Sequence, residues 1–436
     1  MRVAMKPRRR LAVAGAAVVA VTLAACGGGG DSAGSDGAAS GPITIASWAA
    51  AADAMEDTAE LYMAENPGTE IIVERVGHGY ESIIPPLTAG SGAPDVIHVE
   101  QRDFQTFLRQ FDGQFLNLTD EIADREGEFA SIAWEAVTRD GEVFGFPWDL
   151  GPAAVWYRTD FYEQAGIDVD AIETWDDFIA AGHQLQDELD DVSMVTFDLT
   201  GSDPNPSTWM ILMNQLGGRY TNDAGEIDFV NDANVRAMEQ VHAFKEEGIA
   251  LDSGDWSALV QNISSGNTAS VILPIWLGGT IKAQAPDQEG VWGAMPLPAF
   301  ESGGNREANL GGGVLAIHKD TQNAELAIDF LNYALLTEEG QTVQMDYGLF
   351  PSWQPFYESD AIQEEDPYFA TNIGDFFASV STDIPTLEFG PYYMDFHSEL
   401  LNAYGQTLTG AADATAALEQ AEDRAATATG LEIADR

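Results

Sequence analysis

The chain has 436 residues, with 19 lysines and arginines against 71 aspartates and glutamates, and its formal net charge is −52. A surface this acidic repels nucleic acid and anionic lipid headgroups, so the composition argues against a nucleic-acid-binding protein. Hydrophobic residues make up 45% of the chain, a fraction that indicates a folded globular protein. Because about 400 residues exceed what one hydrophobic core usually holds, we expect two lobes.

The N-terminus has the layout of an export signal. Five basic residues and no acidic residue fall within the first ten positions, and an uncharged, largely apolar run follows from 11 to 25. This run is shorter than the roughly 20 residues that a membrane-spanning helix needs. We therefore predict a signal peptide over residues 1–25 rather than an anchoring helix. Three consecutive arginines at 8–10 leave open whether export follows the general or the twin-arginine route.

Cys26 is the only cysteine of the chain and directly follows the apolar run. The sequence LAACG at 23–27 resembles the lipobox of bacterial lipoproteins, in which the cysteine becomes the first mature residue and is lipidated. Because attached acyl chains insert into the bilayer, we expect Cys26 to anchor the exported protein to the outer face of the cell membrane. Residues 26–41 are rich in glycine and serine and predict a flexible tether.

Apolar spacing after the tether predicts alternating strands and helices. In the first part of the chain we expect strands at 42–48, 70–76 and 93–99 and a helix at 53–65, an order that indicates an α/β lobe with mostly parallel strands. Thr174 is a candidate N-cap for a helix at 175–189. The other expected elements are strands at 194–199, 269–273, 292–296 and 310–317, helices at 208–216, 234–247 and 323–336, and a helical C-terminus from 393 to about 428.

Several segments, taken in their order along the chain, resemble the family 1 extracellular solute-binding proteins, the maltose-binding-protein-like group that feeds sugar importers. They include ITIASW at 43–48, SGAPDVIHVE at 91–100, GFPWDLGPAAVWYRTDFYEQAGI at 145–167, ISSGNTASVILPIW at 263–276, WGAMPLPAF at 292–300 and NLGGGVLAIHKD at 309–320. The resemblance implies an α/β, two-lobed periplasmic-binding-protein-like fold of type II. It also implies a hinge of three crossings and a ligand cleft between the lobes.

The family pattern places these lobes along the chain. It implies an N-terminal lobe of residues 42–147 and 299–345 and a C-terminal lobe of residues 148–298 and 346–436. The three crossings are then expected around 146–152, near 297–299 and near 347–348.

A sugar presents apolar CH faces and many hydroxyls, so its site needs aromatic rings for stacking and carboxylates or amides for hydrogen bonds. In open α/β sheets such sites lie beyond the carboxyl ends of strands. Strand ends, the first crossing and one helix start supply the candidates Trp48, Glu100, Trp148, Asp149 and Trp209. The family pattern adds Trp276, Gly312, Gly313 and Tyr392 as ligand-binding positions. The tryptophans that lie inside apolar patterns are predicted to be core residues: Trp134, Trp156, Trp175 and Trp292.

The six histidines show no paired spacing, and no glycine-rich phosphate loop appears, so we predict no metal, no cofactor and no catalytic residue. The resemblance implies a monomeric binding protein that captures a mono- or oligosaccharide and delivers it to the permease subunits of an ABC importer. Two alternatives stay open. One is an exported carbohydrate-active enzyme, such as a glycoside hydrolase with two carboxylates, and the other is a sensor subunit that reports the ligand to a membrane kinase.

Overall fold

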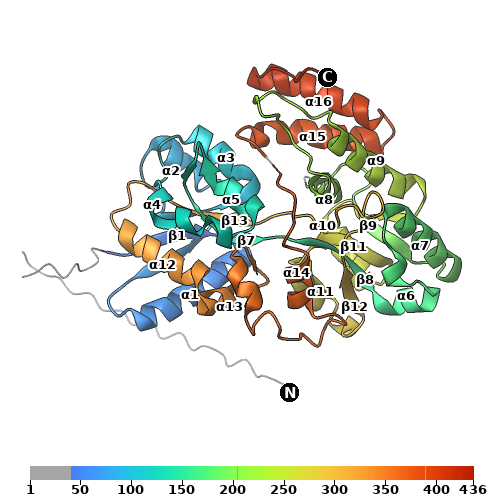
Figure 1. Cartoon of the computed structure of the whole chain (residues 1–436), viewed down its shortest axis with the longest axis horizontal. Coiled ribbons are helices and arrows are strands. Elements are labelled where there is room, and N and C mark those ends of the chain that lie inside the picture. Colours follow the sequence, from blue (N-terminus) through green and yellow to red (C-terminus); the bar gives the residue numbers. More distant parts are fainter. Residues whose placement is uncertain (1–40, 204, 388) are drawn as a thin grey trace, which may run out of the picture. The chain divides into compact units, whose positions relative to one another are not determined.

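The computed structural model describes residues 41–203, 205–387 and 389–436. The predicted signal peptide, Cys26 and nearly all of the predicted tether fall outside the described residues. Within these ranges no helix is both long enough and apolar enough to cross a membrane. The described residues form two five-stranded sheets, each with its own hydrophobic core, and thus two lobes (Figure 1).

The first lobe is built on a sheet with the strand order β2-β1-β3-β13-β6. Strand β1 (Ile43–Ser47) pairs in parallel with β2 (Ile71–Arg75) and with β3 (Val96–Glu100). Strand β13 (Gly313–Ile317) comes from far along the chain and lies antiparallel between β3 and β6 (Phe146–Pro147). The parallel pairing expected for the first three strands is therefore confirmed.

Helices cover this sheet with the apolar faces that the sequence pattern predicts. In the first helix, Met55, Ala59 and Tyr62 recur at helical spacing and all three are buried. The elements around the sheet are α1 (Ala49–Glu65), α2 (Ile84–Ala89), α3 (Gln101–Gln110), α4 (Thr119–Ile122), η1 (Ala123–Glu128), α5 (Ser131–Val137), β4 (Thr138–Arg139), β5 (Glu142–Val143), α12 (Ala324–Leu336) and α13 (Glu338–Asp346).

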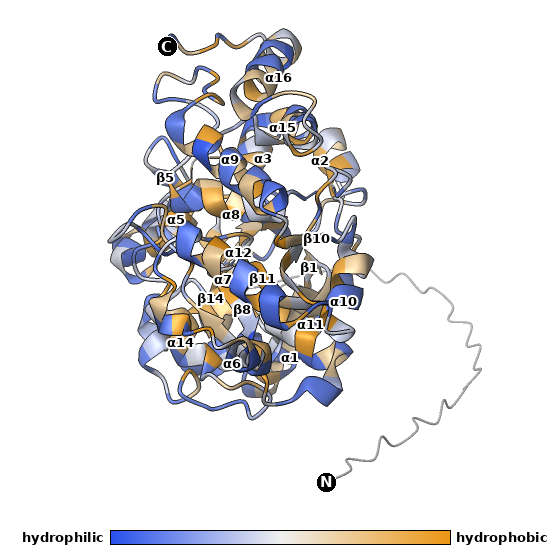
Figure 2. Cartoon of the chain, turned by 90° about the vertical axis from the view of Figure 1, so that its right-hand side faces the viewer, coloured by the Kyte–Doolittle hydropathy of each residue, from blue (hydrophilic) through white to orange (hydrophobic). Residues whose placement is uncertain are grey.

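The second lobe is built on a sheet with the strand order β10-β9-β11-β8-β12. Its central strand β11 (Thr268–Pro274) is buried at every residue, pairing in parallel with β9 (Ser193–Phe197) and antiparallel with β8 (Ala153–Arg158). The outer strands are β12 (Trp292–Met295), antiparallel to β8, and β10 (Ala250–Asp252), parallel to β9. A strand covered on both faces needs a continuous apolar run, and Figure 2 shows hydrophobic colour around β8 and β11.

Helices also cover the second sheet, and α15 and α16 pack against each other. The bounds are α6 (Thr159–Ala165), η2 (Val169–Ala171), α7 (Trp175–Glu188), α8 (Ser207–Gln215), α9 (Asp232–Glu246), α10 (Trp256–Ser264), α11 (Leu277–Gln284), η3 (Pro286–Gln288), η4 (Gln354–Glu358), α14 (Ile373–Ser379), α15 (Tyr393–Leu408) and α16 (Ala414–Thr429). The four tryptophans predicted to be core, Trp134, Trp156, Trp175 and Trp292, are all buried.

Two expected elements differ from the sequence prediction. The C-terminal helical segment is two helices, because Gly410 takes a left-handed conformation with φ of 70° and Asp413 caps the helix that follows. The strand expected from residue 310 begins only at Gly313. The two preceding glycines have φ of 97° and 108°, which no strand accommodates.

Three segments cross side by side between the sheets. Strand β7 (Asp149–Leu150) pairs with β14 (Phe350–Pro351), and the Leu310 N–H donates to the Gly151 carbonyl at 2.8 Å. A Cβ at Gly151 would lie 2.0 Å from the Leu310 carbonyl oxygen, so only glycine allows this approach.

The second crossing lies later than predicted. We expected it near 297–299, but Leu297, Ala308 and Leu310 all belong to the core of the second lobe. Backbone hydrogen bonds hold Ala299 there, since its N–H donates to the Glu173 carbonyl and its carbonyl accepts from the Trp175 N–H. The chain therefore leaves the second lobe at Gly311 and Gly312.

Thr174 caps α7 as predicted, and it does so in a capping box. Its hydroxyl oxygen accepts from the Asp177 N–H at 3.2 Å, while the Asp177 carboxylate accepts from the Thr174 N–H at 2.8 Å. Two of the backbone N–H groups that a helix start leaves unpaired are thereby satisfied.

We expect Thr174→Ala to lower the free energy of unfolding by about 1 kcal/mol, because the helix loses its cap acceptor. Urea denaturation followed by circular dichroism measures this change. Thr174→Ser keeps the hydroxyl and should stay close to the wild type. Equal losses in the two variants would show that the methyl group, and not the cap, carries the effect.

Candidate functional site

A cavity of about 400 Å³ lies between the two lobes, beyond the carboxyl ends of β1, β3 and β11. Residues of both lobes line it, and Ala49 to Ala51 at the start of α1 form part of one wall. Six of the residues predicted for the ligand site come together here: Trp48, Glu100, Asp149, Trp276, Gly312 and Gly313.

On the side of the first lobe, a group of packed aromatic rings lies behind the cavity wall, and two of them, Trp48 and His98, line the cavity. Trp48 stacks on His98 with ring centroids 3.7 Å apart and an interplanar angle of 8°, and His98 in turn meets the edge of Trp148 at 4.6 Å. Ser47 and His98 share a hydrogen bond of 3.0 Å between Oγ and Nδ1. Burial lowers the pKa of His98 to about 3, so its imidazole is neutral at physiological pH.

Glu100 is the charged group at the end of β3. Its Oε1 lies 3.0 Å from the Nε2 of His78, and its side chain is 18% exposed. Burial by itself would raise the pKa of Glu100, but the hydrogen bond from His78 and the charge of Arg102 outweigh it, and the pKa lies below its usual value. The same hydrogen bond raises the pKa of His78. Glu100 is therefore an ionised acceptor at the cavity.

Asp149 lies on the first crossing and reaches the second. Its Oδ1 accepts from the Gly313 N–H at 2.7 Å. Burial, together with the nearby charge of Glu100, raises the pKa of Asp149 to about 7. Near neutral pH this carboxyl is therefore present both as a carboxylate, which only accepts hydrogen bonds, and as an acid, which also donates one.

The glycines of the second crossing permit close packing as well as access to the cavity. Gly312 has φ of 108°, and a Cβ there would lie 2.5 Å from the Asp149 carbonyl oxygen. A Cβ at Gly313 would lie 2.7 Å from the Nε2 of His98. Any side chain at either position would push the crossings apart and fill part of the cavity.

Trp276 lies just beyond β11 and immediately before α11. Its indole is half-buried, and its Nε1 donates to the Leu310 carbonyl at 3.4 Å. The ring is therefore tied to the chain that leaves for the first lobe. Trp256, the first residue of α10, lies next to it with ring centroids 5.8 Å apart.

Sequence reasoning missed further lining residues, among them Arg102, Asp203, Asn205, Ser207, Met210 and Trp256. Arg102 on α3 reaches across to the second lobe, where its guanidinium donates to Asn205 at 3.3 Å. Arg102 follows the end of β3 by two residues, and this position just beyond a strand end was a usable signal for it. For Trp256 the signal was a tryptophan directly after Ser253-Gly254-Asp255, which is a helix-start pattern.

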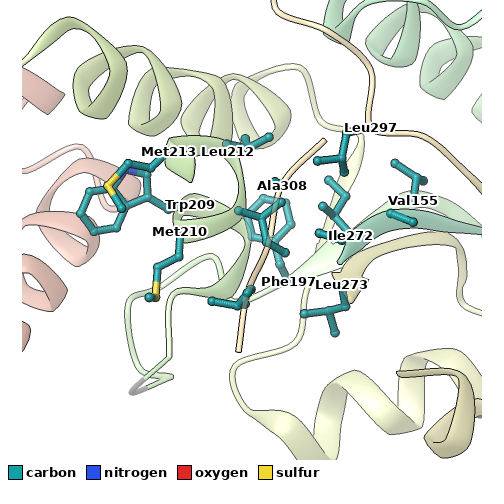
Figure 3. Close-up of a cluster of buried hydrophobic side chains, with 14 of the residues drawn as sticks. Val155, Phe197, Trp209, Met210, Leu212, Met213, Ile272, Leu273, Leu297 and Ala308 are labelled. Atoms are coloured by element: carbon teal, nitrogen blue, oxygen red, sulfur yellow. The ribbon is translucent and has the colours of Figure 1, made fainter. Parts of the chain in front are cut away.

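Three predicted site residues do not line this cavity. Trp148 is buried, and its Nε1 donates to Gln344 at 3.1 Å. Trp209 is equally buried, donates to the Asn234 carbonyl at 3.3 Å and stacks on Tyr404. Figure 3 shows Trp209 on the side of α8 that faces away from the strand residues Ile272 and Leu273. Both indoles thus fill core space and use their single N–H donor there.

Tyr392 lies elsewhere, at a contact between α3 and the start of α15. The guanidinium of Arg109 lies 4.1 Å from the centre of the Tyr392 ring, and Arg109 also pairs with Asp395 and donates to the Pro391 carbonyl at 2.7 Å. One face of the Tyr392 ring is therefore covered by the guanidinium of Arg109 from the first lobe.

Two α/β lobes, three crossings and a cavity lined from both sides define a two-lobed solute-binding protein. The chain belongs to the family of bacterial extracellular solute-binding proteins, which it matches over residues 39–341.

Curated relatives and a solved structure agree with this assignment. The chain is 28% identical to the arabinooligosaccharide-binding protein of Bacillus subtilis strain 168 over 343 residues, 76% of this chain and 77% of the relative. It is 28% identical to the lactose-binding protein of Rhizobium radiobacter over 350 residues, 77% and 80% of the two chains. The sugar-binding protein MalE of Xanthomonas citri matches the fold with a TM-score of 0.76 at 17% identity, covering 88% of this chain and 96% of that one.

Asp149 links the stability of the protein to pH. Its pKa of about 7 in the folded chain lies above the roughly 3.9 of an unfolded aspartate, so the folded state holds the proton more tightly. Stability from this proton is complete at low pH and is lost as the pH rises from about 4 to about 7. Asp149→Asn keeps an oxygen for the Gly313 N–H but does not titrate. We therefore expect the stability of the variant, relative to the wild type, to be greater at about pH 8 than at about pH 5.

Thermal unfolding midpoints of the ligand-free protein, taken at both pH values, measure this gain. Glu60→Gln, an exposed change on α1, is the control for losing one negative charge. A stability difference between Asp149→Asn and the wild type that stays constant with pH would contradict the raised pKa.

Proposed function

We propose that this protein captures a carbohydrate between its two lobes outside the cytoplasm and delivers it to an importer of the ATP-binding-cassette class. The observation that carries the proposal is one cavity at which the rings of Trp48 and Trp276 meet the carboxyl groups of Glu100 and Asp149. Relatives named for binding arabino-oligosaccharides and lactose support a saccharide as the ligand.

The chemistry of three of these side chains, Trp276, Glu100 and Asp149, suits a sugar. The half-buried indole of Trp276 offers an apolar surface to the CH groups of a pyranose or furanose ring. Ionised Glu100 accepts hydrogen bonds from hydroxyls, and each such charge-assisted bond is stronger than a neutral one. Asp149, with its pKa near 7, both accepts from and donates to hydroxyls.

The charges around the cavity favour an uncharged sugar. Three carboxyl groups line it, those of Glu100, Asp149 and Asp203, and Arg102 is the single guanidinium among the lining residues. A uronic acid or a sugar phosphate would be repelled by this balance in a partly desolvated site.

Delivery requires a ligand-dependent change of shape. We propose that the lobes close about the three crossings when a sugar binds, as hinged two-lobed proteins do. The N-terminal lobe would comprise residues 42–147 and 299–345, and the C-terminal lobe residues 148–298 and 346–436. Ala308 and Leu310, which belong to the core of the second lobe, would move with the C-terminal lobe. The closed form then presents both lobe surfaces to the permease subunits.

Calorimetric titration of the purified protein with lactose and with arabino-, galacto- and malto-oligosaccharides tests the function. We expect at least one sugar to bind and to stay intact on chromatography, since the proposal includes no catalysis. Trp276→Ala should weaken that binding by about 10-fold or more through the lost stacking.

The buried Trp209 provides the control for this titration. Trp209→Phe should lower the unfolding midpoint and leave the affinity of the folded protein unchanged, because this indole does not line the cavity. Absence of binding to every sugar, or wild-type affinity in a folded Trp276→Ala protein, would refute the proposal. Shortened oligosaccharides would point instead to an enzyme.

We further propose that Cys26 carries the lipid that holds the exported protein at the membrane. The support is the order of three features: a basic segment at 1–10, an apolar run at 11–25 and the sequence LAAC, which ends at Cys26. Cys26→Ser should move the protein from the membrane fraction to the soluble fraction, or leave the precursor uncut, as seen by immunoblotting of cell fractions. Ser32→Ala, a change within the tether, is the matched control. A Cys26→Ser protein that is still processed and membrane-bound would exclude this anchor.

A further inference from the structure

Trp256 is an exposed tryptophan at the edge of the cavity. All ten tryptophans lie in the described part of the chain, and Trp256 is the one with an exposed side chain, at 44%. It shares a face of α10 with Leu259 and Ile263, at i, i+3 and i+7 spacing, and those two side chains are buried in the core. The first turn of α10 extends past this core, so the indole lines the cavity and does not fill the lobe.

The start of α10 is held in place, which fixes the position of this indole. The Asp255 carboxylate accepts from the Ala258 N–H at 2.9 Å and caps the helix. Trp256 also contacts Trp276, with ring centroids 5.8 Å apart and an interplanar angle of 50°. The two rings make a continuous aromatic surface that leads from the inner cavity to its edge.

A second hollow begins at the same indole. It has a volume of about 480 Å³, similar to that of the inner cavity, and lies between α10 and α11. Its lining is Trp256, Ser257 and Val260 from α10 and Gly279, Thr280, Ala283 and Gln284 from α11. None of these side chains is charged, while hydroxyl and amide groups alternate with apolar ones. Such a surface suits an uncharged ligand that has both hydroxyls and apolar faces.

We propose that Trp256 is the platform for an outer sugar unit, so that the ligand is an oligosaccharide longer than the inner cavity holds. The chain of sugars would run from the inner cavity over Trp276 and Trp256 into the hollow between α10 and α11. This inference rests on the proposed function, because it assigns the outer part of the same site. It explains why a large indole is kept exposed at this point, where water would otherwise cover its apolar face.

Affinity as a function of sugar length tests the proposal. The wild type and Trp256→Ala are titrated with arabino-, galacto- and malto-oligosaccharides of two to five units each. We expect the affinity of the wild type to rise with length in the series that binds. Trp256→Ala should lose about 10-fold for the longest sugars and a clearly smaller factor for the disaccharide. Trp256→Phe should recover part of the loss, since a smaller ring still stacks.

Ile72→Ala is the matched control, because Ile72 on β2 is 41% exposed and belongs to neither hollow. It should bind every length like the wild type. A loss in Trp256→Ala that is the same at every length would overturn the outer platform, and so would wild-type affinity throughout. In both cases the binding of short sugars would leave the proposed function intact. Failure of every sugar to bind the wild type would overturn both proposals together.

Discussion

The hydrogen bonds among the three crossings are the constraint on which the rest of the structure depends. Asp149 accepts from the Gly313 N–H, the Trp148 N–H donates to the Gly313 carbonyl, and the Ser352 N–H donates to the Trp148 carbonyl. These bonds hold three segments from distant parts of the sequence within one hydrogen-bonded layer. Because Gly311 to Gly313 lack side chains, the layer also forms an uncovered wall of the cavity.

The two sides of the cavity differ in how firmly their aromatic residues are held. On the first lobe, the rings of Trp48, His98 and Trp148 pack against one another in the interior. A chain of hydrogen bonds runs from the Trp148 indole to the Gln344 side chain and from there to the Thr58 hydroxyl. A protonated imidazole would be costly in this stack, which is why burial keeps His98 neutral. On the second lobe, Trp276 and Trp256 keep part of their surface free. The first lobe thus contributes aromatic rings that are packed on several sides, and the second contributes rings that are partly exposed.

Basic residues are scarce in this chain, and both arginines of α3 lie at contacts between the lobes. Arg102 reaches Asn205 at the edge of the cavity, while Arg109, two turns further along the helix, contacts Tyr392 and Asp395 at the start of α15. Each of these guanidinium groups of the first lobe has a hydrogen-bond acceptor on the second lobe. The arrangement of the lobes thus depends on a few polar contacts beside the crossings.

The sequence by itself determined the fold class, the order of the strands and helices, the cap at Thr174 and the burial of four tryptophans. The α/β character, the cap and the buried tryptophans follow from local apolar periodicity and capping chemistry, which short segments carry on their own. The two-lobed fold with three crossings was implied by the resemblance to the family. It also indicated four residues that line the cavity. Trp48 and Glu100 follow strand ends of the first sheet. Asp149 lies on the first crossing, and the family resemblance pointed to Trp276.

Only the tertiary structure decided which tryptophans belong to the core and which face the cavity. Trp209 and Trp256 both lie in the first turn of a helix, α8 and α10, so their place in the helix does not separate them. Trp209 finds Tyr404 and the Asn234 carbonyl from distant helices, whereas the core ends beneath Trp256. Whether an indole is covered depends on what packs against it from elsewhere in the chain, and a local pattern holds no information about those partners.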